Sequence, residues 1–177
     1  TPTAVLQTQL RLAECYRALG QFDKAIAAYS AVLKEKETSL DVQRAAAMTY
    51  AERGQREDPK WFENAIHGGN KAKSNGQNLV WGWVKISSLV AKAARKDQSF
   101  RDSFFDARLN IARCRYQAAM KKEGDARRDD LSNAKLGIQS LARVYPDYGG
   151  EKFKPQFEEL LRDIQREEGK LQKQSGA

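Results

Sequence analysis

Residues 12–33 read LAECYRALGQFDKAIAAYSAVL, and this stretch decides the fold class. Apolar residues recur on both sides of Gly20 with the spacing of an α-helix. A glycine directly after such a stretch is typical of a helix C-terminus. We therefore predict helices over residues 3–19 and 22–36. Because only Gly20 and Gln21 connect them, the two helices should form an antiparallel hairpin.

The same stretch carries small side chains where two packed helices must approach closely, at Ala13 and Ala25. The positions of these small side chains, and of the larger residues between them, make the stretch resemble a tetratricopeptide repeat. The matching positions are Leu12, Ala13, Tyr16, Gly20, Phe22, Ala25, Tyr29 and Leu33. Two positions depart from the family pattern, because Gln9 stands in place of a tryptophan and Glu37 in place of a terminal proline.

The rest of the chain continues the helical pattern, and no alternating strand pattern is visible. Glycines end several periodic stretches, at Gly54, Gly76, Gly124 and Gly149-Gly150. We predict further helices over 39–53, from Pro59 to a weak point at 68–69, and over 78–95, 98–123, 129–145 and 151–170. The fold class is therefore all-α, with about eight helices. The resemblance implies antiparallel helical hairpins stacked as a short right-handed solenoid.

We interpret residues 1–177 as a single domain in which only residues 1–37 form a regular repeat. Residues 39–75 form a degenerate repeat, with Ala46, Ala47, Tyr50 and Gly54 on its first helix. Residues 98–146 form a split repeat, in which a loop around 124–130 separates the helix of residues 109–114 from Ala134, Ile138 and Leu141. Residues 78–95 add a helix that breaks the alternation, and residues 151–171 form a capping helix.

Composition restricts the possible functions. The 177 residues carry a net charge of +8, and residues 77–124 hold ten basic and four acidic residues. A basic surface of this kind attracts acidic partners. Cys15, Cys114 and the single histidine, His67, fit no zinc cluster, disulfide framework or catalytic triad. We expect two buried thiols, no enzymatic activity, no cofactor or metal, and no small-molecule substrate.

Two apolar or basic features have more than one interpretation. Trp81-Gly82-Trp83 lies in an apolar stretch, which favours a core helix over an exposed aromatic platform. Arg101, Arg108, Arg115 and Lys122 are seven residues apart and so form one stripe on a helix. The stripe either pairs with acids of neighbouring helices, or forms a groove for an acidic peptide, or contacts nucleic acid, although no nucleic-acid-binding motif accompanies it.

The resemblance implies a concave face, lined by the first helix of each repeat, that binds an extended peptide or a helix. The positions implied are Gln7, Leu10, Glu14 and Arg17, then Asp41, Arg44, Met48 and Ala51, then Leu109, Arg113 and Tyr116. With the basic stripe, the predicted partner-binding residues are Arg17, Arg44, Met48, Arg108, Arg113, Arg115 and Tyr116. These lack the Lys- and Asn-rich pattern of repeats that clamp a C-terminal carboxylate.

We therefore predict a non-catalytic scaffold that binds a protein or peptide through the concave face or through the basic stripe, with an acidic partner in the second case. The alternatives are a nucleic-acid-binding helical module, which the sequence favours less, and an accessory domain of a larger enzyme. No stretch approaches the 18 apolar residues of a membrane-spanning helix, so no membrane insertion is expected. The compartment stays open between cytoplasm and periplasm.

The small residue at position 25 gives the first testable prediction. Replacing Ala25 by leucine should overpack the crossing of the first hairpin and lower the free energy of unfolding by roughly 1–3 kcal/mol. Thermal or urea denaturation of Ala25→Leu measures the change. An unchanged melting temperature would show that the repeat has been placed in the wrong register.

Overall fold

The computed structural model describes residues 2–71 and 76–175, and within them the fold is all-α apart from one small sheet. The helices are α1 (Pro2–Ala18), α2 (Phe22–Glu35), α3 (Leu40–Arg56), α4 (Trp61–His67), α5 (Gly82–Val90), α6 (Gln98–Met120), α7 (Gly124–Val144) and α8 (Lys154–Ser175). A 3₁₀-helix, η1, covers Ala93–Arg95, and strands β1 (Gly69–Lys71) and β2 (Asn78–Val80) form the sheet. The chain divides into two compact units, Thr1–Ile86 and Ser87–Ala177.

The first hairpin, α1 and α2, forms as predicted. Gly20 adopts a φ of +72° in the turn, a conformation that disfavours side chains with a Cβ. Ala13 and Ala25 are fully buried where the helices meet, and Tyr29 and Leu33 fill the space beside them. The predicted burial of Cys15 is wrong, because Cys15 lies two residues, or about 200°, around α1 from Ala13 and is exposed.

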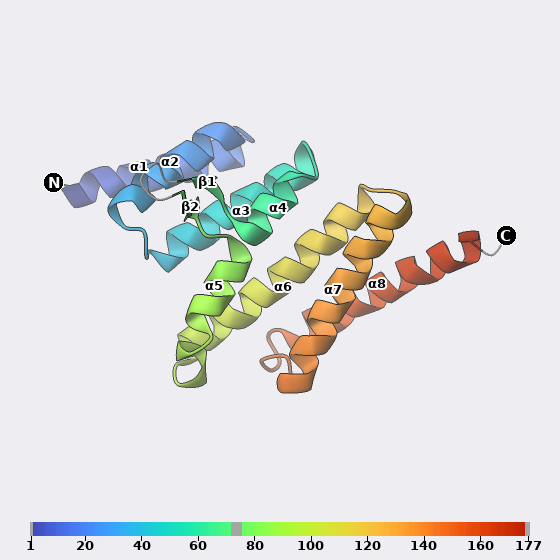
Figure 1. Ribbon diagram of the computed structural model, residues 1–177. Coiled ribbons are helices and arrows are strands. Elements are labelled where there is room, and N and C mark those ends of the chain that lie inside the picture. Colours follow the sequence, from blue (N-terminus) through green and yellow to red (C-terminus); the bar gives the residue numbers. More distant parts are fainter. Residues whose placement is uncertain (1, 72–75, 176–177) are drawn as a thin grey trace. The chain divides into compact units, whose positions relative to one another are not determined.

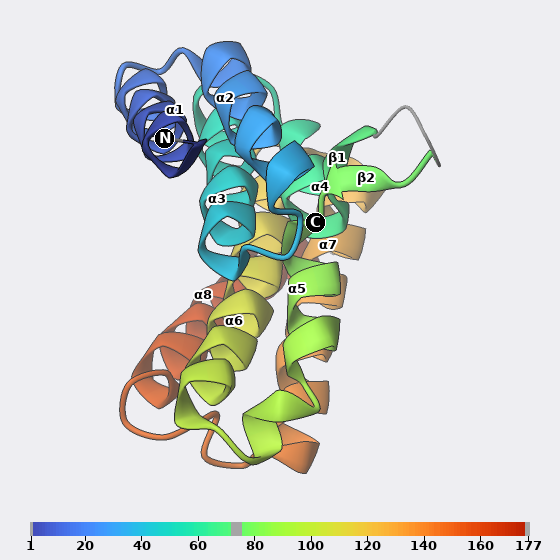
Figure 2. The same cartoon turned by 90° about the vertical axis from the view of Figure 1, so that its left-hand side faces the viewer.

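The second hairpin, α3 and α4, packs through α3 on α2 (Figure 2). Gly54 does not end α3 as predicted, because the helix continues to Arg56. It is instead a contact point, since a Cβ built at Gly54 would lie 2.9 Å from ring atoms of Phe62. The α4 helix begins at Trp61 rather than at Pro59. The absence of a side chain at position 54 thus lets α4 lie directly against α3.

The β1–β2 hairpin, which the sequence did not predict, follows α4. Gly69 pairs with Val80 and Lys71 with Asn78 in antiparallel register. The fully buried amide of Gln43 on α3 holds β2 in place. Its Nε2 donates to the Leu79 carbonyl at 3.0 Å, and its Oε1 accepts from the Trp81 amide at 2.9 Å. Residues 72–75, the end of the predicted degenerate repeat, lie outside the described residues.

Two glycines fix the base of this hairpin. Gly68 and Gly82 have φ angles of +90° and +71°. A Cβ at Gly68 would lie 2.2 Å from the Val80 carbonyl oxygen, and one at Gly82 would lie 2.3 Å from the Gly68 nitrogen. The two backbones therefore touch. The single helix predicted over 78–95 is wrong, because the stretch is divided into β2, α5 and η1.

The tryptophans beside Gly82 belong to the core. Trp81 is 7% and Trp83 1% exposed, which confirms the core interpretation over the exposed platform. The Trp81 indole Nε1 also donates to a Glu37 carboxylate oxygen at 3.3 Å.

The second unit contains a long hairpin in which α6 and α7 lie side by side (Figure 1). The predicted loop at 124–130 is wrong, because α7 already begins at Gly124 and that segment is its first turns. The predicted pairing is confirmed, since Leu109 on α6 shares one buried cluster with Ala134, Ile138 and Leu141 on α7.

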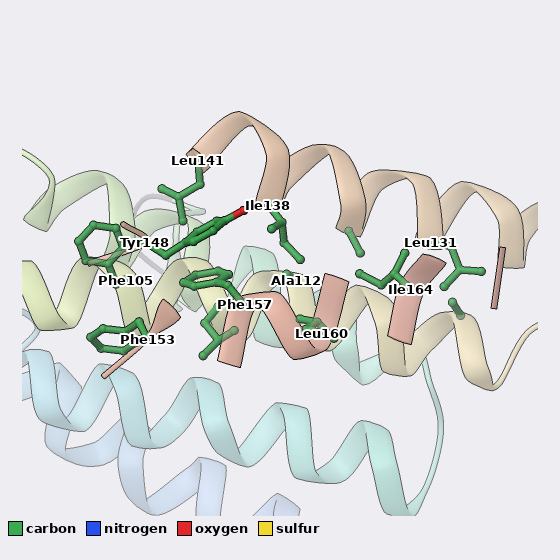
Figure 3. Packing of buried hydrophobic residues seen from close by; sticks show 13 residues of the cluster. Phe105, Ala112, Leu131, Ile138, Leu141, Tyr148, Phe153, Phe157, Leu160 and Ile164 are labelled. Carbon is green, nitrogen blue, oxygen red and sulfur yellow. The ribbon is translucent and has the colours of Figure 1, made fainter. Parts of the chain in front are cut away.

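Aromatic residues close this cluster at one end (Figure 3). The Phe105 ring meets those of Tyr145 and Phe153 with centroids 5.3 and 5.9 Å apart, and Tyr148 stacks on Phe157 at 5.1 Å. Such pairs contribute about 0.5–1.5 kcal/mol beyond the area that they bury. The chain between α7 and α8 is thus packed onto the core of the unit.

The last helix, α8, packs mainly on α7 and buries Phe157, Leu160 and Ile164. Ion pairs border this apolar face. Arg127 donates to Glu167 at 2.7 Å, and Lys135 donates to Glu168 at 2.7 Å. The role of α8 as a cap stays a prediction.

The contact at Gly54 predicts opposite effects for one substitution at two helical glycines. Gly54→Ala should lower the free energy of unfolding by roughly 1–3 kcal/mol, because the new methyl group meets the Phe62 ring. Gly137→Ala on α7 is the matched control. It places a methyl group in open space and should raise the free energy of unfolding by about 0.5–1 kcal/mol. Urea denaturation measures both, and stabilisation by Gly54→Ala would contradict the close contact.

The ion pairs of Glu167 predict a pH dependence. Its hydrogen bond from Lys170, together with the charges of Lys170 and Arg127, holds the pKa of Glu167 below its ordinary value. The carboxylate therefore stabilises the fold at neutral pH, and this contribution is lost as the pH falls through the lowered pKa. We expect the stability advantage over Glu167→Gln to be largest near pH 7 and to shrink below about pH 4. Denaturation series of both proteins measure it, and an advantage that is constant down to acidic pH would refute it.

Candidate partner-binding site

A hollow of about 460 Å³ lies in the first unit, between the C-terminal turns of α1 and α3. Its lining residues are Glu14, Arg17, Ala18, Glu52 and Arg56. Residues three or four apart share one side of a helix, which places Glu14, Arg17 and Ala18 together on α1, and Glu52 and Arg56 together on α3. The hairpin turn at Gly20 and the packing of α3 on α2 bring the two sets opposite each other.

An ion pair between Arg17 and Glu52 spans the hollow. The Arg17 Nε lies 3.1 Å from one carboxylate oxygen of Glu52, and an Nη lies 3.1 Å from the other. About a third of each side chain is exposed, so water screens the pair only in part. This two-pronged geometry is the strong form of a charged hydrogen bond, and it fixes the orientation of both side chains.

Tyr29 of α2 lies beside this pair. Its side chain is fully buried, and burial raises the pKa of the phenol, while the nearby Arg17 guanidinium opposes the increase. The Tyr29 hydroxyl forms no well-aligned hydrogen bond within the described residues, and the Arg17 side chain is the polar group that approaches it. The Arg17 guanidinium thus lies near both the Glu52 carboxylate and the Tyr29 phenol.

The remaining charges of the hollow are exposed. Glu14 and Arg56 both face solvent, and the Arg56 guanidinium lies 5.8 Å from the centre of the Phe22 ring. With two acids and two bases, the lining has no net charge. Such a surface can donate to carbonyl groups and accept from amide groups, which is the chemistry that a peptide backbone presents.

The predicted residues of the first unit are only partly brought together here. Arg17 lines the hollow, whereas Arg44 and Met48 lie on α3, half-buried, two turns and one turn before Glu52. The sequence did not single out Glu52 and Arg56. The spacing could have identified both, because residues 44, 48, 52 and 56 follow one another at intervals of four and so share one face of α3.

In the second unit, two predicted residues of α6 lie toward α8. An Arg113 Nη donates to the Gln156 side chain at 2.8 Å, and Tyr116 packs against the core cluster. Burial raises the pKa of Tyr116, and the carboxylates of Asp163 and Glu167 on α8 raise it further. The α8 helix therefore occupies the side of α6 on which the resemblance implied an open groove.

The basic stripe of α6 meets α7 and the segment after it. Lys122 pairs with Asp130 at 2.7 Å, Arg115 donates to the Asn133 carbonyl at 3.1 Å, and Arg101 pairs with Asp147 at 3.4 Å. Arg108 is half-buried between them. Burial lowers the pKa of the Arg108 guanidinium, and the charge of Arg115 lowers it further.

Comparisons with known proteins agree with the first hairpin. Residues 7–35 match the family model described as tetratricopeptide repeat. No curated protein and no solved structure matches the chain. Within residues 2–71 and 76–175, no helix has the length and apolar character needed to cross a membrane, and no three His, Cys, Asp or Glu side chains lie together as metal ligands would.

Proposed function

Since the chain carries a tetratricopeptide repeat at residues 7–35, a module of protein–protein interaction, we propose that it is a non-catalytic scaffold that holds a peptide segment of a partner protein between α1 and α3. The observation that carries the proposal is the hollow spanned by Arg17 and Glu52. Stacked helical repeats present extended concave surfaces of this kind to their partners.

The chemistry of the hollow supports a peptide as the ligand. Glu14 can accept from a peptide amide and Arg56 can donate to a peptide carbonyl, and both side chains are exposed. The pair of Arg17 and Glu52 is already ordered, so a ligand that contacts it loses little side-chain entropy on binding. A lining with no net charge favours mixed or neutral peptide sequences at this position.

The same face of α3 extends the proposed surface. Arg44 and Met48 follow from Glu52 toward the start of the helix, and both are half-buried. Methionine is unbranched and polarisable and adapts to differently shaped apolar groups. We therefore place a further side chain of the bound segment against Met48.

A nucleic-acid ligand has less support. The nucleic-acid hypothesis rested on the basic stripe of α6. In the structure, Arg101, Arg115 and Lys122 each have an acceptor within the second unit. Cations that are already paired add little to phosphate binding, because binding strength depends on the charges that are free to replace counterions.

Selection of peptides tests the proposed function. A phage-displayed library of random peptides is panned on the intact domain, and Kd values of the selected peptides are measured by calorimetry. We expect Glu14→Ala and Arg56→Ala to weaken binding about tenfold each, which corresponds to about 1.4 kcal/mol. Both side chains are exposed, so neither change should lower the melting temperature appreciably.

The matched control is Lys34→Ala, an exposed charge at the end of α2 that does not line the hollow. It should leave the Kd unchanged. Selected peptides that bind Glu14→Ala and Arg56→Ala as tightly as the wild type would place the binding surface elsewhere and refute the proposal.

A further inference from the structure

The exposed side of α7 carries a row of residues whose order is symmetric about its middle. The row consists of Asp129, Ser132, Leu136, Ser140 and Arg143, and every member is exposed. Their spacings of three, four, four and three residues keep them on one side of the helix. We call this row the outer stripe of α7.

The opposite side of α7 packs on α6 and α8. From that side Leu131, Ile138 and Leu141 point into the buried cluster (Figure 3). Leu136 lies about 200° around the helix from Ile138 and is 55% exposed. A single exposed leucine is common on soluble proteins and needs no partner. What distinguishes Leu136 is the pattern of the residues on either side of it.

The charges at the two ends of the outer stripe are opposite in sign. Asp129 stands seven residues before Leu136, and Arg143 stands seven residues after it. Neither charged side chain has an ion pair or hydrogen bond among residues 2–71 and 76–175, whereas the adjacent Asp130 pairs with Lys122 at 2.7 Å. The fold therefore leaves both end charges available to a partner.

Reversing the outer stripe exchanges its two charges and keeps everything else in place. In either direction the order is charge, serine, leucine, serine, charge, with the same spacings. A second copy of α7 that runs antiparallel across Leu136 therefore sets Asp129 opposite Arg143 at both ends. A two-fold axis makes the two ion pairs identical, as in other isologous dimers.

The spacing of the stripe also fits the geometry of helix pairing. Positions seven residues apart drift by about 20° per heptad, and helices that cross at about 20° keep such stripes in contact. Asp129 and Arg143 each lie about 10 Å along the axis from Leu136. Ser132 and Ser140 are small, so they allow the two helices to approach closely at the central leucine.

We propose that the outer stripe of α7 is a self-association surface, on which a second copy of this chain docks antiparallel through two symmetric Asp129–Arg143 ion pairs and a central Leu136 contact. Parallel docking would set like charges opposite each other, which is unfavourable. A phosphate backbone that followed the stripe would be repelled at Asp129. The surface lies in the second unit, so the proposal does not depend on peptide binding between α1 and α3.

Charge reversal tests the pairing. Sedimentation equilibrium of the intact protein at low salt, over a range of concentrations, should show a monomer–dimer equilibrium. Asp129→Arg and Arg143→Asp should each weaken self-association about tenfold or more, because each sets like charges together at both ends. An equimolar mixture of the two variants should form a heterodimer, since every facing pair is then opposite in charge. The double variant should regain self-association for the same reason.

Two further variants separate the stripe from the rest of the surface. Arg162→Asp reverses an exposed arginine of α8 outside the stripe and should leave self-association unchanged. Leu136→Gln should weaken self-association without lowering the melting temperature appreciably, because the leucine is exposed in the monomer. Melting curves check that each variant folds.

A disulfide trap tests the antiparallel arrangement. Cys15→Ser first removes the exposed thiol of the wild type. In that background Leu136→Cys should form an intermolecular disulfide under mild oxidation, because the two-fold axis brings position 136 next to its own copy. Arg162→Cys is the matched control, and it should stay reduced under the same conditions.

Four results would overturn the proposal. A wild-type protein that stays monomeric at every concentration would show that the stripe does not associate. A dimer that persists unchanged in Asp129→Arg and Arg143→Asp would place the interface elsewhere. A mixture of these variants that stays monomeric would show that the two charges do not face each other. Equal disulfide formation at positions 136 and 162 would show random collision rather than docking.

Discussion

Close approach of helices at small residues is the constraint on which the first unit depends. Helix axes that pack 8–10 Å apart leave room only for small side chains where they cross. Ala13, Ala25, Ala46 and Ala47 are all fully buried, and Gly54 allows an even closer contact with the Phe62 ring. The packing of α1 on α2 and of α2 on α3 brings α1 and α3 near each other. One arginine and one glutamate can therefore meet across the hollow, with both pairs of atoms at 3.1 Å.

Much of the fold could be predicted from the sequence, because helices leave a strong period in apolar residues. The first hairpin and the pairing of Leu109 with Ala134 and Ile138 were both readable. The β1–β2 hairpin was not, because strands of three residues are too short to show alternation. The role of Gly54 was also predicted wrongly, as the end of a helix. A glycine signals a turn and a close contact equally well, and only the partner's position tells Gly54 from Gly20.

The candidate site was harder to predict, because it depends on which helices face each other. Arg17 could be placed on the inner side of α1 from the repeat pattern, but its partner Glu52 lies 35 residues away on another hairpin. The stripe on α6 was visible as a spacing of seven, yet the acceptors that Arg101, Arg115 and Lys122 find on α7 and in the segment after it were not. The side of α6 that carries Arg113 was expected to be open, and the resemblance contained no sign that α8 would pack there.

The two glycines at the base of the β-hairpin have a consequence for reading related sequences. At Gly68 the added carbon would strike the Val80 carbonyl, and at Gly82 it would strike Gly68 itself. Neither change can be compensated by shrinking a neighbour, because the obstacle in each case is backbone. Evolution should therefore keep both positions as glycine among relatives that bind quite different partners. Invariance at this pair would record a backbone crossing, and it should not be taken as the mark of a ligand.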